Sequence, residues 1–354
     1  LEAVTSTPYS WTEYVYDLSE YAGQAIYLAV QRVSVGQYYL FVDDFELTAD
    51  PLLIAGFTAD DTTGVLPLTI NFTDQSWGNP TSWSWNFGDS GTSADQNPAH
   101  TFQTAGSYSI SLTVSNGTEN DSLIKTDYIS VISQTYVPDD NFEQALIDLG
   151  YDDTLDDYVV TDSISGVTSL DVGEKEISDL TGIEAFTALD VLYCDNNQLT
   201  SLDVSSNTAL TGLWCNSNSL TSLDVSTNTS LTSLRCYDNQ LTSLDVSANT
   251  ALTYLYCYTN QLAALDVSAN TALTLLTCSI NELTALDVSN NTALTTLYCR
   301  SNQLTAMDVS ANTALTSLNC RNNQLTSLDV SANTALTYLI CSINQLTYLN
   351  MRNG

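Results

Sequence analysis

The chain is poor in positive charge and in long apolar runs, and each shortage excludes a class of function. Its 354 residues contain 7 Lys and Arg against 41 Asp and Glu, a formal net charge of -34. A chain with this much negative charge repels nucleic acid and anionic membranes. Neither is therefore an expected partner. The sequence also has no run of about 18 apolar residues, the length that spans a bilayer, so we expect no insertion into a membrane.

The chain contains a single histidine, so hydrolytic mechanisms that depend on histidine find little support. The single histidine, His100, lies in the run Asn97-Pro-Ala-His-Thr, and H-E-x-x-H, phosphate-loop, C-x-x-C and G-x-S-x-G motifs are all missing. The many carboxylates would allow a glycosidase-like pair by residue type, but such a pair needs a cleft that regular repeats do not usually build. We therefore predict that the chain is not an enzyme.

Cysteine is present in an unusual arrangement. Eight cysteines follow one another at intervals of 21 residues: Cys194, Cys215, Cys236, Cys257, Cys278, Cys299, Cys320 and Cys341. Neither disulfide frameworks nor zinc sites space thiols in this way, so the spacing indicates a tandem repeat. The unit reads L-x-x-L-x-C-x-x-N-x-L-x-x-L-D-V-S-x-N-T-x, a leucine-rich-repeat pattern with Cys at an inward apolar position.

The repeat predicts a solenoid with a short parallel strand in each coil. In the segment L-x-C the Leu and Cys point inward and the residue between them points outward. Because all eight cysteines share this orientation, we expect free, buried thiols rather than disulfides. The segment L-D-V-S-x-N-T is rich in poor helix formers, which favours extended or turn structure there. Two columns of Asn, one from Asn197 to Asn344 and one from Asn207 to Asn333, are expected to bind backbone groups at the turns.

The residues before the repeats predict a helical cap. Asp139 or Asp140 can cap a helix in which Phe142 and Leu146 form part of an apolar stripe, and Glu143 can reach back to the helix start. We assign residues 134–166 to a linker and helical cap and residues 167–354 to the solenoid. The cap and repeats resemble leucine-rich-repeat surface proteins of Bacteroidota and, more remotely, internalins.

Residues 53–133 form a separate unit. The runs Trp83-Ser-Trp85-Asn-Phe87-Gly-Asp89, Asn97-Pro-Ala-His-Thr-Phe102 and Gly106 to Asn116 resemble a PKD domain, an immunoglobulin-like β-sandwich. Ser90 departs from that pattern as an insertion in one turn. The alternation of residues places Trp85 and Phe87 in the sandwich core, and His100 is expected to be structural.

Residues 1–50 are interpreted as the C-terminal part of a jelly roll. The runs Trp11 to Ser19, Tyr21 to Tyr27 and Phe41 to Phe45 resemble cleaved-adhesin or MAM-like modules. Three strands do not close a two-sheet sandwich, so the remainder would come from upstream sequence or another molecule. The fold class is therefore mainly β: a partial jelly roll, a PKD-like sandwich, and a capped leucine-rich-repeat solenoid.

The outward positions of the L-x-C strand and the residues after it vary most between repeats and are rich in Tyr, Trp and Arg. Such side chains give large contact areas at low entropic cost, which is typical of a recognition surface. The alternative is that tyrosines cover and stabilise an exposed sheet. The candidate binding residues are Tyr193, Trp214, Arg235, Tyr237, Tyr254, Tyr256, Tyr258, Tyr298, Arg300 and Arg321, with Tyr338, Ile340 and Ile343 at similar positions.

Carboxylate clusters suggest calcium as the only candidate cofactor. An Asp recurs in every repeat from Asp203 to Asp329, and hydrogen bonds from Ser or turn N–H groups are the alternative explanation to bridging calcium. Further calcium candidates are Asp43, Asp44, Asp152, Asp153, Asp156 and Asp157. Three short motifs resemble the Asp-Ser/Thr-aliphatic O-glycosylation signal of Bacteroidota, with Ser122, Thr154 and Ser163 as the acceptors.

The sequence as a whole predicts an extracellular or cell-surface protein that binds a glycan or a protein through the concave solenoid face. The resemblance implies export by a type IX route, and Leu at position 1 leads us to expect a fragment of a longer chain. Two alternatives remain open. One is a structural subunit of an extracellular filament or surface layer, which would self-associate through the partial N-terminal domain and the solenoid end. The other is an accessory module of a secreted hydrolase.

Overall fold

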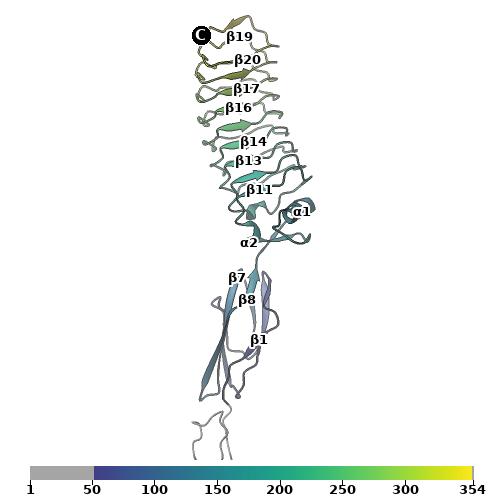
Figure 1. Ribbon diagram of the computed structural model, residues 1–354, viewed down its shortest axis with the longest axis vertical. Helices are drawn as coiled ribbons and strands as arrows, with labels where there is room; N and C mark the ends of the chain where they lie inside the picture. The colour runs from purple at the N-terminus through teal and green to yellow at the C-terminus, as the bar shows by residue number, and fades with distance from the viewer. Residues whose placement is uncertain (1–51, 353–354) are drawn as a thin grey trace, which may run out of the picture. The chain divides into compact units, whose positions relative to one another are not determined.

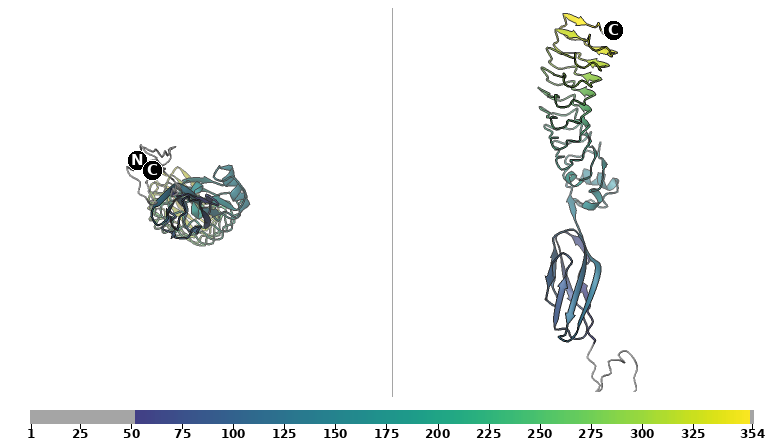
Figure 2. Two further views of the ribbon diagram at one scale, coloured as in Figure 1. Left: turned by 90° about the horizontal axis from the view of Figure 1, so that it is seen from below. Right: turned by 90° about the vertical axis from the view of Figure 1, so that its left-hand side faces the viewer.

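The computed structural model describes residues 52–352. The jelly roll expected for residues 1–50, and with it Asp43 and Asp44, lies outside the described residues. Within them the chain is mainly β, with a sandwich followed by a solenoid whose coils stack one on another (Figures 1 and 2).

The sandwich consists of a three-stranded sheet, in the order β1-β3-β6, and a five-stranded sheet, in the order β2-β8-β7-β4-β5. Trp85 and Phe87 are each 1 % exposed in its core, as their alternation in the sequence predicts. Ser90 takes a left-handed conformation, with φ 76°, in the turn where the sequence has its insertion. The strands are β1 (Phe57–Ala59), β2 (Thr63–Val65), β3 (Leu68–Asp74), β4 (Ser82–Asn86), β5 (Thr92–Ser93), β6 (Ala99–Phe102), β7 (Gly106–Ser115) and β8 (Asn120–Ile132).

Two short helices and a two-stranded sheet precede the repeats. They are β9 (Gln134–Tyr136), α1 (Asp140–Asp148), β10 (Tyr158–Val160) and α2 (Thr161–Ile164), with β9 antiparallel to β10. Asp139 caps α1 by accepting hydrogen bonds from the N–H groups of Asn141 and Phe142, both at 3.0 Å. Phe142 and Leu146 are fully buried in one core with the first repeats.

The expected role of Glu143 is wrong. Its Oε1 accepts hydrogen bonds from the backbone N–H groups of Asp156, at 2.9 Å, and Tyr158, at 3.1 Å. Glu143 lies on the buried side of α1, so its carboxylate supports the loop after the helix and does not return to the helix start.

The solenoid sheet is parallel and has nine strands, because the irregular first repeat contributes β11 and eight cysteine-bearing repeats contribute the others. Each strand is three residues long, and its middle residue faces inward. The strands are β11 (Ser169–Asp171), β12 (Val191–Tyr193), β13 (Gly212–Trp214), β14 (Ser233–Arg235), β15 (Tyr254–Tyr256), β16 (Leu275–Thr277), β17 (Thr296–Tyr298), β18 (Ser317–Asn319) and β20 (Tyr338–Ile340).

The opposite side of the coils is made of turns and extended backbone, with two further parallel strands, β19 (Ser327–Asp329) and β21 (Tyr348–Asn350). A single turn of 3-10 helix, η2 (Ile183–Ala185), belongs to the irregular repeat. Seven of the eight cysteines are buried and all eight are free, but Cys341 is partly exposed. The expectation that all are buried is therefore wrong for Cys341, which follows β20, the last strand of the nine-stranded sheet.

Both asparagine columns bind backbone groups. In the first, Asn281 Nδ2 donates to the carbonyls of Cys257 (3.0 Å) and Cys278 (3.1 Å), while Oδ1 accepts the N–H of Leu262 at 3.0 Å. In the second, Asn270 Nδ2 donates to the carbonyls of Val246 and Asn249, both at 2.9 Å. Amide side chains thus tie each coil to the previous one, where strands are too short to do so alone.

Candidate functional site: the concave face of the solenoid

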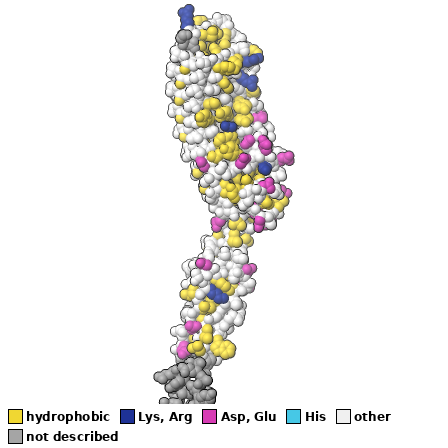
Figure 3. Space-filling model, in the orientation of Figure 1, with side chains coloured by type: hydrophobic (Ala, Val, Ile, Leu, Met, Phe, Trp, Pro, Cys, Tyr) yellow, Lys and Arg dark blue, Asp and Glu magenta, His cyan; other side chains and the backbone are white. Residues whose placement is uncertain are grey.

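The outward side chains of the sheet lie in columns because successive strands pair in register. Tyr193 aligns with Trp214, Trp214 with Arg235, and Arg235 with Tyr256. Parallel strands lie about 4.8 Å apart, so side chains in one column touch their neighbours. Figure 3 shows hydrophobic side chains gathered on the solenoid around a Lys or Arg group.

The first column forms a continuous stack of four side chains. The rings of Tyr193 and Trp214 stack with centroids 4.7 Å apart. Arg235 Cζ lies 5.1 Å from the Trp214 ring and 5.0 Å from the Tyr256 ring, so the guanidinium is held between two aromatic faces. Each such contact is worth about 0.5 to 1 kcal/mol at an exposed site. The four residues, Tyr193, Trp214, Arg235 and Tyr256, are called the aromatic stack below.

A second pair lies beside this stack. The rings of Tyr237 and Tyr258 are nearly parallel, with centroids 4.3 Å apart. Desolvation by burial, together with the neighbouring Tyr237, raises the pKa of Tyr258 to about 12. The Tyr258 hydroxyl, like that of an ordinary tyrosine, is protonated at neutral pH and is able to donate a hydrogen bond.

Gly212 makes room for the indole of Trp214. A Cβ at residue 212 would overlap Trp214 Cζ3, so any larger residue would displace the ring. The sequence analysis missed this residue. Its signal is that Gly occurs at this strand position in one repeat only, two residues before the single Trp of the solenoid.

The structure separates the ten predicted binding residues into two groups. Six of them are in the aromatic stack and the Tyr237–Tyr258 pair, and Tyr254 stands 46 % exposed beside them. Tyr298 lies further along the sheet, where its hydroxyl is 3.0 Å from Ser317 Oγ. Arg300 and Arg321 follow β17 and β18 and are exposed.

Turn hydrogen bonds account for the recurring aspartates. Asp266 Oδ1, for example, accepts the backbone N–H of Ser268 at 2.8 Å, and hydrogen bonds from that serine hold the pKa of Asp266 below its usual value. The same contact recurs in each repeat from Asp203 to Asp329. These carboxylates are thus used locally, as the alternative to calcium bridging predicts.

The loop after α1 brings acidic side chains together. Desolvation, with smaller contributions from nearby Glu143, Asp156 and Asp153, raises the pKa of Asp152. Within residues 52–352, however, no three His, Cys, Asp or Glu side chains are grouped closely enough to hold a metal ion. The assignment of Asp152, Asp153, Asp156 and Asp157 to a calcium site stays a prediction.

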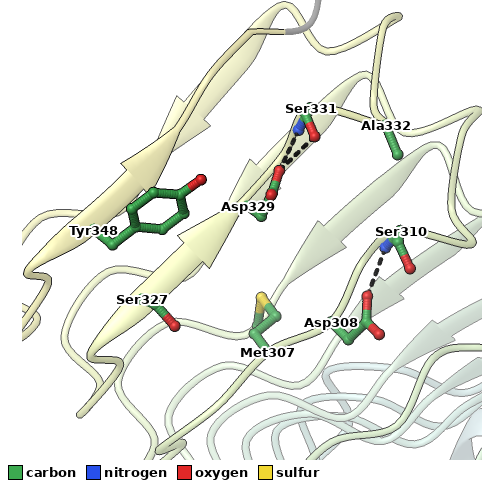
Figure 4. A pocket seen from close by; sticks show the side chains of 8 residues that line it. All are labelled: Met307, Asp308, Ser310, Ser327, Asp329, Ser331, Ala332 and Tyr348. Carbon is green, nitrogen blue, oxygen red and sulfur yellow. Dashed lines mark hydrogen bonds between the residues drawn. The ribbon is translucent and has the colours of Figure 1, made fainter.

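A shallow hollow of about 340 Å³ lies at the side of the solenoid opposite the nine-stranded sheet (Figure 4). Asp308 and Asp329 line it, but each accepts the N–H of the serine two residues later. Met307 occupies a position that is Leu in the other repeats, and this departure is the feature that marks it in the sequence. Nothing in this lining resembles an acid and base pair.

The lone histidine is tied into the sandwich. His100 Nε2 lies 2.7 Å from Asp89 Oδ2, and its ring stacks on Phe87 with centroids 4.1 Å apart. The pKa of Asp89 is lowered, because hydrogen bonds from His100 and from the N–H of Gly91 outweigh desolvation. This arrangement fixes a turn, as expected for a structural histidine.

Comparisons with known proteins agree with this architecture. Residues 48–131 match the PKD domain family. The structure described as the functional domain of InlJ from Listeria monocytogenes, which includes a cysteine ladder, is 44 % identical, with a TM-score of 0.57. That match covers 61 % of this chain and 51 % of the InlJ chain. Internalin J of L. monocytogenes serotype 4b is 43 % identical over 72 residues, which are 20 % of this chain and 8 % of the relative.

Internalin C2 of L. monocytogenes shares the fold at 22 % identity, with a TM-score of 0.53 and coverage of 60 % of this chain and 94 % of that one. This chain thus spans about half of the solved InlJ chain and a small part of the curated relative. None of these matches is to a catalytic family, and no helix among the described residues is long and apolar enough to cross a membrane. The chain therefore has a PKD domain and a leucine-rich-repeat solenoid similar to that of the internalins.

Proposed function

We propose that this chain is a non-enzymatic binding module of the cell surface or extracellular space, and that the concave face of its solenoid contacts the partner. The observation that carries the proposal is the aromatic stack. Its aromatic and Arg side chains are half-buried and mutually fixed, so they lose little conformational entropy on binding. The internalin-like repeats support a protein partner, because leucine-rich-repeat relatives are interaction modules.

The helical segment before the repeats has a structural role in this proposal. Phe142, Ala145 and Leu146 of α1 share one core with Leu170 and Leu192 of the first two strands. A solenoid needs such a polar-faced element over its terminal coil, because the coil would otherwise expose its core to water. We therefore assign α1 and α2 to an N-terminal cap.

Binding through the concave face is tested with a triple variant, Trp214→Ala/Tyr256→Ala/Tyr258→Ala. Labelled whole chain is applied to immobilised panels of purified extracellular proteins and of glycans. We expect any specific signal to fall about tenfold or more, because these positions supply the large buried contacts. The melting temperature should change by only a few degrees, since the three side chains are half-exposed.

The matched control is Thr208→Ala/Thr229→Ala/Thr250→Ala, which alters three exposed side chains outside the sheet. It should bind like the unchanged chain. Equal binding by the two folded variants would show that the tyrosines merely cover the sheet.

Surface modification is a second expectation for an exported protein. Ser122, Thr154 and Ser163 are all exposed, although Ser122 Oγ lies 2.8 Å from Thr113 Oγ1 and Thr154 Oγ1 donates to Asp153 at 3.2 Å. Intact-mass analysis of natively expressed protein should show added hexose-scale mass, lost stepwise in the three Ser/Thr→Ala variants. An unmodified native mass would refute this assignment.

A further inference from the structure

The concave face carries three arginines that form no ion pair with any carboxylate in the part of the chain that the structure describes. Among residues 52–352 the ion pairs join Lys175 to Asp148 and His100 to Asp89, and neither involves Arg235, Arg300 or Arg321. The chain has 41 acidic residues, so unpaired arginines are not explained by a shortage of carboxylates.

Arg235 is the most firmly positioned of the three. Trp214 and Tyr256 hold its guanidinium from both faces, and its Nε is buried with no hydrogen-bond partner among the described residues. A guanidinium fixed in this way can bind a carboxylate in two parallel hydrogen bonds only through the edge formed by its two Nη groups. Its orientation is therefore set before any partner arrives.

Arg300 and Arg321 form an adjacent pair. Their coils are joined where the N–H of Ser301 donates to the carbonyl of Arg321 at 2.8 Å, and both side chains are exposed. Like charges on neighbouring coils repel each other, and an anion placed between them removes that repulsion. Three strand spacings separate β14 from β17, so Arg235 lies about 14 Å from this pair along the sheet.

The aromatic stack favours a protein over a sugar as the occupant. Both faces of Trp214 are covered, one by Tyr193 and the other by Arg235. A sugar ring that stacks on an aromatic residue needs a free face, whereas ring edges and hydroxyl groups suit a peptide. The polar groups that this surface offers to a peptide are thus guanidinium groups and tyrosine hydroxyls.

We propose that the concave face binds an acidic segment of a partner protein, with carboxylates at the Arg300–Arg321 pair and at Arg235. An extended segment of about four or five residues spans the distance between them. This inference rests on the proposed function and specifies its partner. The net charge of -34 does not prevent such binding, because repulsion between separated charges is screened beyond about 8 Å at physiological ionic strength.

The test uses the whole chain and a fluorescein-labelled oligoglutamate peptide, with oligoglutamine as the neutral probe. Fluorescence anisotropy should show salt-sensitive binding of oligoglutamate alone. Arg300→Gln/Arg321→Gln should raise Kd about tenfold or more, as expected for the loss of charge-assisted hydrogen bonds. Lys175→Gln/Arg352→Gln removes the same charge from exposed residues elsewhere and should leave Kd nearly unchanged.

Several results would overturn the proposal. Equal Kd values for the two double variants, or no binding of oligoglutamate, would show that the arginines do not form the proposed site. Arginine-dependent binding of a heparin oligosaccharide without binding of oligoglutamate would assign the face to a sulfated glycan. Light scattering that shows an oligomer dissolved by Arg300→Gln/Arg321→Gln would make a second copy of the chain the occupant. Because Trp214, Tyr256 and Tyr258 are unchanged here, these outcomes are distinct from failure of the aromatic variant.

Discussion

Replacing Asn281 with alanine is expected to lower the free energy of unfolding by roughly 2 to 5 kcal/mol. The side chain is 8 % exposed, and its hydrogen bonds with the Leu262 N–H and the Cys257 carbonyl join two coils, while that to the Cys278 carbonyl lies within its own coil. The Cys257 and Cys278 carbonyls retain other donors, Asn260 and Asn302. The Leu262 N–H has no other acceptor among the described residues, so the variant leaves a buried donor unpaired.

Asn290→Ala provides the matched control, because it removes the same side chain from an exposed position in the same repeat. Its amide makes one longer hydrogen bond, 3.3 Å from the carbonyl of Ser268. Urea titration followed by circular dichroism should place the Asn281→Ala midpoint well below that of Asn290→Ala. Coincident midpoints would mean that the asparagine column adds little to the backbone hydrogen bonds.

The regular part of this fold is predictable from the sequence, because stacking coils imposes the same requirement every 21 residues. An inward Leu and Cys and a turn Asn recur since each coil must bury the same surface and satisfy the same backbone groups. The sandwich core at Trp85 and Phe87 follows for a similar reason, from alternation along a strand.

The backbone conformation at one turn position could not be predicted from the sequence. The residue before each first-column Asn has a left-handed backbone, with φ 56° even at Ile280 and Ile343. Asn, Ser and Asp at this position in other repeats are compatible with that conformation, but β-branched residues adopt it rarely. Stacking against adjacent coils therefore overrides local preference, which no single repeat reveals.

The candidate binding residues were predicted from their variation between repeats, but their grouping in space was not predicted. The sequence places Trp214, Arg235 and Tyr256 in one column, yet the position of the guanidinium between two rings depends on rotamers and on the space above Gly212. That Arg300 and Arg321 form no ion pair among the described residues likewise depends on how each coil turns. Such features can be recognised only when the positions of the side chains in space are known.

The cysteines are expected to react much more slowly in the native protein than in the unfolded chain. Burial raises the pKa of Cys236 and Cys278 to about 12 each and that of Cys257 well above its ordinary value. A thiol reacts as its thiolate, so two effects slow the alkylation of these cysteines: the thiols stay protonated, and their burial keeps the reagent away. In native protein at mildly alkaline pH, the buried cysteines should react with iodoacetamide about a hundredfold or more slowly than in urea.

Peptide mass spectrometry of the labelled chain resolves the individual sites. Cys341, which is partly exposed, should be alkylated first, and all eight cysteines should react after unfolding without reductant. Fewer than eight labels under those conditions would show that some thiols are oxidised or bound to metal. Simultaneous native labelling of Cys341 and Cys257 would contradict a packed core, because a reagent that reaches Cys257 must first separate coils that the asparagine columns join.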